Sequence, residues 1–582
     1  MKKARAKADK DRPAGRAASS GRTIPAGPTL QPWHCWAALG AAFLAVLIVY
    51  WPAIEGPFVF DDQYLPFTGQ EYANAPLSRW MSSVRPLVMF SFWINHSLSG
   101  MQTFSYHFLN LVLHVITGAL CFLIVRRFLD RAGESGWKRD GLAAFAAGLF
   151  LLHPLQTESV AYVACRSEAL SVMFLYAAFT VFLYRRSEAI GWLEALAVVA
   201  LFAAAVSTKE HTAVLPALLV LTDIFWNPGA SFRAVGRNWR LYAPVAIAGA
   251  VALRMVWRIL RSADTAGFTL TAFTWEQYFY TQCRVIWLYV RLFFLPYGQN
   301  IDHDFAVSKT LFAHGAIIGL AALALAAAAA IYYRRRYPLA SYGYLVFLLL
   351  LAPTSSFAPI LDVVAEHRMY LPFLGLLLVV VEFVRRWKAP PARVATALAG
   401  VLALMAVLTY SRSAVWGNAE ALWKDAVAKS PDKSRPHFQL GFLYFTQGRC
   451  ADAMPEFVAA AKDGPPTYGL LSDWGMDYEC LGRHDEAIDK LRHAAGFRPD
   501  ANSYSTLAWA FLRAGRNGEA AQALDMAERL DPSFAATYAY RGDLYAAQGN
   551  PAGAASEYRR ALSLDPGNEV AQDGLARLRT AR

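Results

Sequence analysis

Two adjacent acids, Asp61 and Asp62, closely follow the first hydrophobic stretch of the chain. A charged side chain beside lipid is costly unless it is paired or used, so this position favours a site for chemistry or ion handling. A carboxylate here could act as a general base on a hydroxyl group. In the structural alternative, the pair caps a short helix or forms an ion pair with Arg85. The sequence leaves both interpretations open.

The next candidates lie in the segment HPLQTESVAYVACRSEAL, between two further hydrophobic stretches. Glu158 could hold a metal or position an acceptor, and Arg166 could bind phosphate oxygens through its planar guanidinium. An ion pair of Arg166 with Glu158 or Glu168, tying two helix ends together, is an equally good interpretation. His153 opens the same segment and is a further candidate.

Three later segments carry further ionisable residues. Arg368 is well placed to bind an anionic group at the membrane surface, although cations at helix ends are common. Asp302, His303 and Asp304 could form a trio of metal ligands, or simply belong to a solvated loop. The remaining candidates in these segments are Lys209, His211, Glu366, His367 and Tyr370.

The six cysteines show no Cys-x-x-Cys spacing, which argues against a metal site built on thiolates. We assign no metal site from the sequence, although a divalent metal is compatible with the acids. Cys450 and Cys480 could pair in an oxidising compartment. From the sequence we favour the alternative, that both are small unpaired core residues.

The composition predicts an integral membrane protein. Hydrophobic residues make up 56% of the 582 residues, charged residues only 17%, and there are 17 tryptophans. The formal net charge of +12 does not predict nucleic-acid binding, because Lys and Arg are concentrated in the amino-terminal segment and in short loops. Residues 1–34 are polar and basic, and we expect them to form a disordered cytoplasmic tail.

Residues 35–411 are expected to form a polytopic helical bundle, since about 20 apolar residues span a bilayer. Segment 279–296 is hydrophobic but carries Arg284 and Arg291, so we expect it to lie in the membrane interface. Counting it as a span would put the basic cluster 334–336 outside, against the positive-inside rule. The other hydrophobic stretches predict about eleven spans, near 35–53, 107–128, 141–157, 160–184, 191–206, 211–226, 241–260, 311–332, 340–353, 369–384 and 394–411.

With that count, the basic loops share the side of the amino-terminal tail, which the positive-inside rule makes cytoplasmic. The candidate acids and bases lie in loops on the opposite, extracytoplasmic face. An odd number of spans sends the carboxyl-terminal segment to that same face. The sequence therefore predicts that the ionisable candidates and this segment lie together outside the cytoplasm.

Residues 412–582 carry an internal repeat. Prolines recur at intervals of 34, 34, 33 and 34 residues, which is the tetratricopeptide period: Pro431, Pro465, Pro499, Pro532 and Pro566. Glycines recur in phase at the expected turns: Gly448, Gly482, Gly515 and Gly549. Each helix pair cannot bury its apolar face alone, so the pairs are expected to stack into a solenoid that binds a protein or peptide partner.

These segments together resemble a known family. FVFDDQY, RPL, YHFLNLVLH, FLLHPLQTESVAYVACRSEAL, STKEHTAVLPALLVLTD, IDHDF and EHRMYLP occur in this order ahead of the repeats. They resemble, nearly end to end, the transmembrane and tetratricopeptide-repeat containing O-mannosyltransferase-like proteins of the glycosyltransferase C superfamily. The resemblance implies an all-α fold: a polytopic membrane bundle of glycosyltransferase C type followed by a tetratricopeptide-repeat solenoid.

The resemblance also implies a function. The chain would transfer mannose or another hexose from a polyprenyl-phosphate donor, reached from within the membrane, to an extracytoplasmic acceptor, with protein Ser or Thr presented beside the repeats. Asp61 or Asp62 would serve as the base and Glu158 would assist in catalysis. The donor phosphate would be bound by cations: Arg85, Arg166, Lys209, His211 and Arg368. The alanine-rich body suggests a bacterial cytoplasmic membrane.

Two other functions are compatible with parts of the sequence. A non-catalytic membrane scaffold would use a structural acid pair and would recruit partners through the repeats. A transporter would carry charged residues near the middle of the bilayer and broken helices. The acids and cations gather instead in loops at one face, so we place the transporter last.

Overall fold

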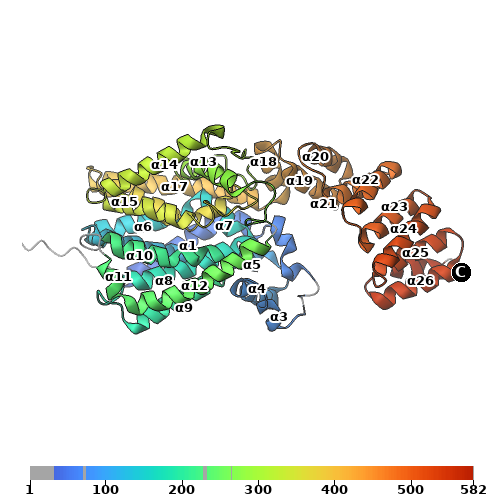
Figure 1. Ribbon diagram of the computed structural model, residues 1–582, viewed down its shortest axis with the longest axis horizontal. Helices are drawn as coiled ribbons and strands as arrows, with labels where there is room; N and C mark the ends of the chain where they lie inside the picture. The colour runs from blue at the N-terminus through green and yellow to red at the C-terminus, as the bar shows by residue number, and fades with distance from the viewer. Residues whose placement is uncertain (1–31, 70–71, 73, 227–231, 264, 581–582) are drawn as a thin grey trace, which may run out of the picture.

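The computed structural model describes residues 32–69, 72, 74–226, 232–263 and 265–580. Within these residues the fold is all-helical, with one isolated bridge between Ala266 and Ile360. This confirms the expected fold class. The predicted tail 1–34 lies almost wholly outside the described residues. Figure 1 shows a bundle of long helices, with a row of shorter helices extending from one end of it.

Eleven helices of the described residues form the bundle, one for each stretch that the sequence predicts to span the membrane. They are α1 (Pro32–Ile54), α5 (Thr103–Arg131), α6 (Gly136–Leu152), α8 (Arg166–Leu183), α9 (Trp192–Val206), α10 (Leu215–Trp226), α12 (Trp239–Ser262), α14 (Ala316–Tyr332), α15 (Pro338–Leu351), α16 (Phe373–Arg385) and α17 (Pro391–Trp416). Six segments are long and apolar enough to cross a membrane: Trp36–Ile54, Thr103–Arg131, Val163–Leu183, Trp239–Ser262, Ala313–Tyr332 and Pro391–Trp416. The chain is a multi-pass membrane protein.

The other five helices of the bundle are shorter, and their crossing of the membrane stays a prediction. The two shortest, α10 and α16, have 12 and 13 residues. The 3-10 segment η5 (Glu210–Val214) directly precedes α10, and η7 (Glu366–Met369) lies shortly before α16. Helices α15 and α16 cross so closely that a Cβ atom on Gly343 would lie 2.4 Å from the Gly375 carbonyl oxygen. Glycine at both positions permits this approach.

Several short elements and one helix of 20 residues gather at the end of the bundle from which the repeats extend. They are η1 (Phe60–Tyr64), η2 (Pro66–Thr68), α3 (Leu77–Met81), α4 (Pro86–Ser99), η3 (Pro154–Gln156), α7 (Thr157–Ala161), η4 (Val163–Cys165), α13 (Trp275–Phe294) and η6 (Ala313–Gly315). At the opposite end lies α11 (Arg233–Arg237). The repeat-bearing end is called the outer end below, and the opposite one the inner end.

The segment predicted to lie in the membrane interface forms α13, and one face of it is buried against the bundle. The Tyr278 hydroxyl donates to the Thr354 carbonyl oxygen at 2.6 Å. The Phe293 ring stacks on His153, with ring centres 5.5 Å apart. Both ends of α13 therefore contact segments of the outer end, an arrangement compatible with the prediction, whereas its depth in a membrane stays a prediction.

The repeat region continues directly from α17, which extends to Trp416 and so passes the boundary expected at residue 411. Its helices are α18 (Ala419–Lys429), α19 (Ser434–Thr446), α20 (Cys450–Lys462), α21 (Tyr468–Cys480), α22 (His484–Phe497), α23 (Ala501–Arg513), α24 (Asn517–Leu530), α25 (Ala535–Ala547), α26 (Pro551–Leu564) and α27 (Glu569–Thr580). The four expected turn glycines all adopt φ between 71° and 73°, where a side chain would be strained.

One prediction for the repeats is wrong. The sequence favoured unpaired cysteines, whereas Cys450 and Cys480 form a disulfide with their Cα atoms 6.2 Å apart. Cys450 is the first residue of α20 and Cys480 is the last residue of α21. These antiparallel helices from successive repeats bring the two residues together, which spacing along the sequence does not reveal.

Candidate active site

A cavity of about 540 Å³ opens at the outer end of the bundle. Its volume is in the usual range for small-molecule sites. One side is apolar and is formed mainly by α4 and by Ile259 of α12. The acidic and basic side chains that line it come from four separate segments: Asp61, Arg85, Lys209, Glu210 and His367. The structure therefore brings four of the residues singled out as site candidates from the sequence, and the unassigned Glu210, to one cavity.

The two adjacent aspartates have different environments. Asp62 is fully buried, and its carboxylate accepts hydrogen bonds from the backbone N–H groups of Ala164, at 2.6 Å, and Val59, at 3.3 Å. Asp61 is exposed and lines the cavity. Its backbone N–H donates to the Tyr162 hydroxyl at 2.9 Å. Asp62 therefore holds the loop in place, whereas Asp61 lies in the wall of the cavity.

Desolvation raises the pKa of both carboxyls, since Asp62 is fully buried and Asp61 is partly shielded from solvent at the cavity wall. The pKa of Asp62 rises to about 7, since desolvation outweighs its backbone hydrogen bonds. Desolvation also raises the pKa of Asp61, while the Tyr162 hydroxyl and the Arg435 guanidinium act in the opposite direction. A carboxylate with a raised pKa is a better proton acceptor than an ordinary aspartate.

Phe60, directly before Asp61, has φ of 53°, which a residue with a side chain rarely adopts. Its ring packs on Trp423 of α18, with ring centres 5.7 Å apart, and on Tyr162 at 6.2 Å. The Arg435 guanidinium lies 5.1 Å from the centre of the same ring. The strained backbone beside Asp61 is therefore held partly by α18 and α19, the first two helices of the repeat region.

The cations that line the cavity are paired with acids. Arg85 Nη2 lies 2.8 Å from Glu210 Oε1. Burial raises the pKa of the Glu210 carboxyl, but Arg85, a backbone N–H and Lys209 together outweigh this and hold that pKa below its usual value. Lys209 Nζ lies 2.6 Å from Glu168 Oε2, and His211 Nε2 lies 3.1 Å from the other oxygen of Glu168. Lys209 reaches the cavity, whereas His211 is buried behind it.

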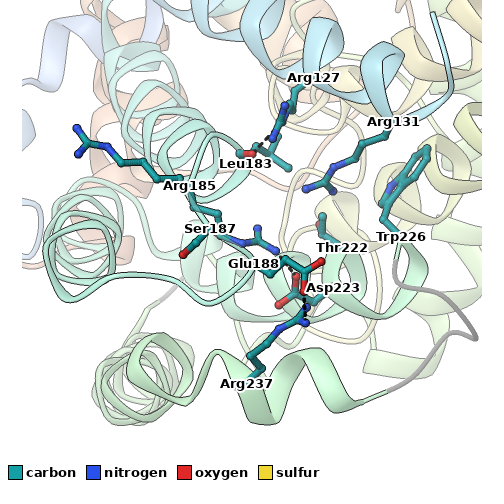
Figure 2. Close-up of a pocket in the computed structure, with 11 residues that line it drawn as sticks. Arg127, Arg131, Leu183, Arg185, Ser187, Glu188, Thr222, Asp223, Trp226 and Arg237 are labelled. Carbon is teal, nitrogen blue, oxygen red and sulfur yellow. Dashed lines mark hydrogen bonds and ion pairs between the residues drawn. The ribbon is translucent and has the colours of Figure 1, made fainter.

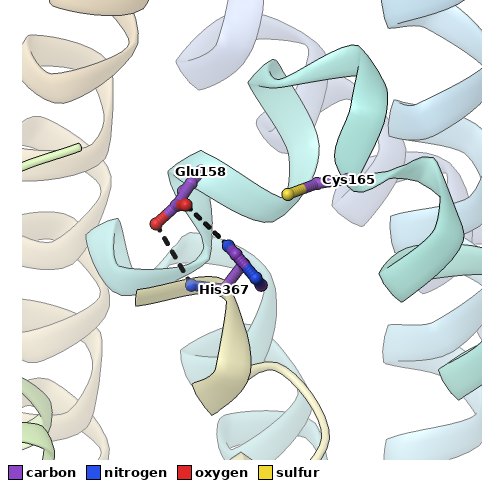
Figure 3. Close-up of side chains that lie close together, drawn as sticks. All are labelled: Glu158, Cys165 and His367. Carbon is purple, nitrogen blue, oxygen red and sulfur yellow. Dashed lines mark hydrogen bonds and ion pairs between the residues drawn. The ribbon is translucent and has the colours of Figure 1, made fainter. Parts of the chain in front are cut away.

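Glu158 and His367 form a pair at the edge of the cavity. Glu158 Oε1 lies 2.6 Å from His367 Nδ1, and the other carboxylate oxygen accepts from the backbone N–H of His367 at 3.1 Å. Figure 3 shows Cys165 beside them. The ligand atoms of these three residues lie within 4.8 Å of one another. Oxygen, nitrogen and sulfur donors of this kind could hold a divalent metal such as zinc, although the Cys165 thiol is buried, and burial opposes the thiolate form that a metal would bind.

The phosphate-binding role predicted for Arg166 is wrong. Its side chain is fully buried, and its guanidinium donates to Asn110 Oδ1 at 2.8 Å, Asn95 Oδ1 at 2.6 Å and the Tyr106 carbonyl oxygen at 2.8 Å. It also lies over the Phe92 ring. The alternative ion pair with Glu158 or Glu168 is absent among the contacts of the described residues. Arg166 joins helices through neutral acceptors instead.

Arg368 is also directed away from the cavity. Its guanidinium donates to the Asp362 carbonyl oxygen at 2.5 Å and to the Tyr278 hydroxyl at 3.3 Å, so it fixes the loop before η7. His153 uses both ring nitrogens, with Phe293 and Leu155. These contacts correct the assignment of Arg368 and His153 to the site. Tyr370 is likewise a core residue, bonded through its hydroxyl to His114 at 2.9 Å.

The trio at 302–304 does not converge as metal ligands, since its members bind other partners. Asp302 is buried and accepts hydrogen bonds from Lys433 and, at 2.6 Å, from Arg435 Nε. His303 pairs with Glu366 at 2.8 Å. The Asp304 side chain is exposed. These contacts hold the start of the repeat region against the outer loops. The three residues therefore form a contact between the two regions and not the metal site that the sequence allowed.

Four residues at or near the site were not predicted as site residues: Tyr162, Cys165, Glu210 and Arg435. Glu210 lies between the predicted residues Lys209 and His211 in STKEH, and this position could have identified it as a site residue. Tyr162 lies within VAYVAC, where nothing distinguishes it from a core aromatic residue. Arg435 is in the repeat region, and its approach to Asp61 depends on how the two regions dock.

Comparisons with known proteins agree with the resemblance seen in the sequence. A tetratricopeptide repeat family model matches residues 505–569. The mouse protein O-mannosyl-transferase TMTC3 is 26% identical over 90% of this chain and 63% of its own length. Its human counterpart is 24% identical over 90% and 64%. Protein O-mannosyl-transferase F38B6.6 of Caenorhabditis elegans is 22% identical over 72% and 61%.

The chain thus spans less than two thirds of the length of these relatives. Among solved structures, the tetratricopeptide protein YrrB aligns with 31% of this chain and 89% of its own, at 18% identity and a TM-score of 0.25. The Cut9–Hcn1 structure aligns with 88% and 99%, at 14% identity and a TM-score of 0.25. The sequence comparisons confirm the resemblance to the transmembrane and tetratricopeptide-repeat containing family.

Proposed function

We propose that this chain, like the O-mannosyl-transferases it resembles, transfers a sugar to protein, with mannose or another hexose moving from a polyprenyl-phosphate donor to a Ser or Thr hydroxyl. The observation that carries the proposal is the cavity at the outer end, where Asp61 faces Arg85, Lys209 and His367. Such a set supplies a base for a hydroxyl and cations for a phosphate within one space.

In the proposed reaction Asp61 accepts the proton of the acceptor hydroxyl as its oxygen attacks the anomeric carbon of the sugar. The bond from that carbon to the phosphate oxygen breaks, and polyprenyl phosphate leaves with the electron pair. Arg85 and Lys209 would stabilise the departing phosphate. Each is now paired with a carboxylate, so the donor phosphate would compete with Glu210 for Arg85.

We propose in addition that the site can hold a divalent metal. Glu158, Cys165 and His367 would hold it, and it would supply Lewis-acid stabilisation of the phosphate. The proposed reaction can also proceed with the cations of the cavity alone. Loss of transfer on chelation, restored by adding one metal, would identify it as a cofactor.

We propose that the cavity lies outside the cytoplasm of a bacterium, with the amino terminus inside and the repeats outside. The distribution of basic loops supports this orientation. The disulfide Cys450–Cys480 supports it independently, because disulfides persist in oxidising compartments such as the periplasm. The repeats would then stand beside the cavity and could present a protein or peptide acceptor.

Transfer by the purified full chain tests the proposal. The protein is incubated with a polyprenyl-phosphate-linked mannose and a Ser/Thr-containing peptide, and the peptide is analysed by mass spectrometry. Asp61→Asn should lower the rate by about 100-fold or more, as expected for loss of a general base. The matched control is Asp304→Asn, an exposed aspartate outside the cavity, which should retain the normal rate.

The same experiment decides between transferase and scaffold. If neither the normal chain nor Asp304→Asn modifies the peptide with any lipid-linked hexose offered, the transferase proposal fails. A scaffold would retain its cellular function in Asp61→Asn and lose it on substitution of repeat residues such as Trp474.

A further inference from the structure

A second cavity, of about 520 Å³, lies at the inner end of the bundle. Helix α8 connects the two sites, since Ser167 near its start lines the first cavity and Leu183 at its end lines the second. An α-helix rises 1.5 Å per residue, so the cavities are separated by roughly 25 Å. The second cavity therefore lies close to the opposite membrane surface.

The lining of this cavity is strongly basic. Five arginines line it, from the end of α5, the loop after α8, and α11: Arg127, Arg131, Arg185, Arg186 and Arg237. Only two acids line it, Glu188 and Asp223. The positive-inside rule accounts for basic residues at this end of the bundle, but it does not require them to converge on one cavity.

Both acids are already engaged. Asp223 accepts hydrogen bonds from Arg185 at 3.1 Å, from Asn238 at 2.8 Å and from Tyr242 at 2.9 Å. Glu188 pairs with Arg237, with 2.5 Å between Oε2 and Nη1. The two acids thus neutralise two of the five arginines, and three positive charges remain in the lining.

None of these three guanidiniums forms an ion pair with a carboxylate of the described residues, although Arg131 interacts at longer range with Asp223 and Arg186 with Glu194. Arg127 donates through Nε to the Leu183 carbonyl oxygen at 3.1 Å, which leaves its terminal N–H groups available. Arg131 packs over the Phe128 ring and, in Figure 2, reaches from α5 into the space beside Thr222. Arg186 is exposed at the rim. The cavity is therefore suited to an anion with several oxygen acceptors.

We propose that this cavity binds the phosphodiester headgroup of an anionic membrane phospholipid. Guanidinium groups match phosphate oxygens with paired hydrogen bonds. Basic pockets between helices at the cytoplasmic membrane surface suit such headgroups. Trp226 and Leu183 form an apolar part of the lining, along which the acyl chains of the bound lipid can extend from the cavity into the membrane. Tryptophan is favoured at membrane interfaces. The proposal is independent of the reaction proposed for the outer cavity.

Lipid binding to the purified full chain provides the test. Photoreactive phosphatidylglycerol in nanodiscs should crosslink to residues 183–188 or 222–226, and unlabelled phosphatidylglycerol should compete. The double variant Arg127→Gln/Arg131→Gln should reduce crosslinking at least tenfold. Arg334→Gln/Arg335→Gln removes the same charge from two exposed arginines outside the cavity and should leave crosslinking unchanged.

Arg186→Gln provides a second variant should the double variant fail to fold, because this exposed side chain forms no hydrogen bond or ion pair with another described residue. It should weaken crosslinking two- to fivefold. Equal competition by phosphatidylcholine, or unchanged crosslinking in both cavity variants, would overturn the proposal. Competition by millimolar inorganic phosphate as strong as that by the lipid would identify a site for a free anion instead.

Discussion

Adjacent residues of one type acquire different roles here through their surroundings. Asp61 and Asp62 share the same local sequence, but only the first reaches the cavity, while the second is held by backbone N–H groups. The sequence identified the pair and could not separate its members, because the separation depends on residues about a hundred positions away. Tyr162 and Ala164 make those contacts.

The pH dependence of transfer should report the state of Asp61. It acts as a base only when ionised, and its pKa is raised by desolvation, so the acidic limb of the rate profile should lie above about 4, the ordinary value for aspartate. Arg435 lowers that pKa from the repeat side. Arg435→Gln should therefore shift the acidic limb to higher pH, measured as the rate of peptide modification between pH 4 and pH 9. An unshifted limb would contradict the coupling of Arg435 to Asp61.

Substitutions of Arg166 and Arg85 should have different effects, the first on stability and the second on the rate of transfer. Arg166→Met removes a buried guanidinium and leaves the acceptors Asn95 and Asn110 unsatisfied. The free energy of unfolding should therefore fall by about 3 kcal/mol or more. Arg85→Met removes a partly exposed cation of the cavity, and it should lower the rate of transfer with little change in thermal stability. Thermal unfolding in detergent and the transfer assay measure the two effects. Loss of activity in Arg166→Met at full stability would restore the direct role predicted from the sequence.

At the scale of elements, hydrophobic stretches and the 34-residue period were sufficient to predict both helical regions and the repeat turns. The docking of one region on the other was not predictable, since it depends on side chains that meet in space. Asp302 illustrates this, because the sequence predicted either a metal ligand or a residue of a solvated loop, whereas Asp302 is buried and pairs with Lys433 and Arg435 of the repeat region. The disulfide was missed for the same reason.

The disulfide should stabilise the repeats. Closing a loop of about 30 residues restricts the unfolded chain and stabilises the fold by about 3.6 kcal/mol. Cys450→Ser/Cys480→Ser should therefore lower the unfolding temperature of the repeat region, and reducing agent should have the same effect on the normal chain only. Cys283→Ser, which changes a buried cysteine outside the repeats, serves as the control. Insensitivity of the normal chain to reductant would contradict the pairing.

At the scale of the whole molecule, the two ends of the bundle carry different chemistry. The outer end combines acids, paired cations and the docked repeats, whereas the inner end carries an arginine-rich cavity. Charge distribution along the sequence anticipated this asymmetry through the positive-inside rule. It could not reveal the cavities themselves, because loops distant in sequence form each of them.

The sidedness of transfer in sealed vesicles tests the account most directly. Vesicles of known orientation, loaded with polyprenyl-phosphate-linked mannose, are given a membrane-impermeant Ser/Thr peptide from outside. Right-side-out vesicles should modify the peptide at once, inside-out vesicles only after permeabilisation, and vesicles carrying Asp61→Asn in neither orientation. Modification by intact inside-out vesicles, or full activity of Asp61→Asn, would contradict the placement of the reaction in the outer cavity.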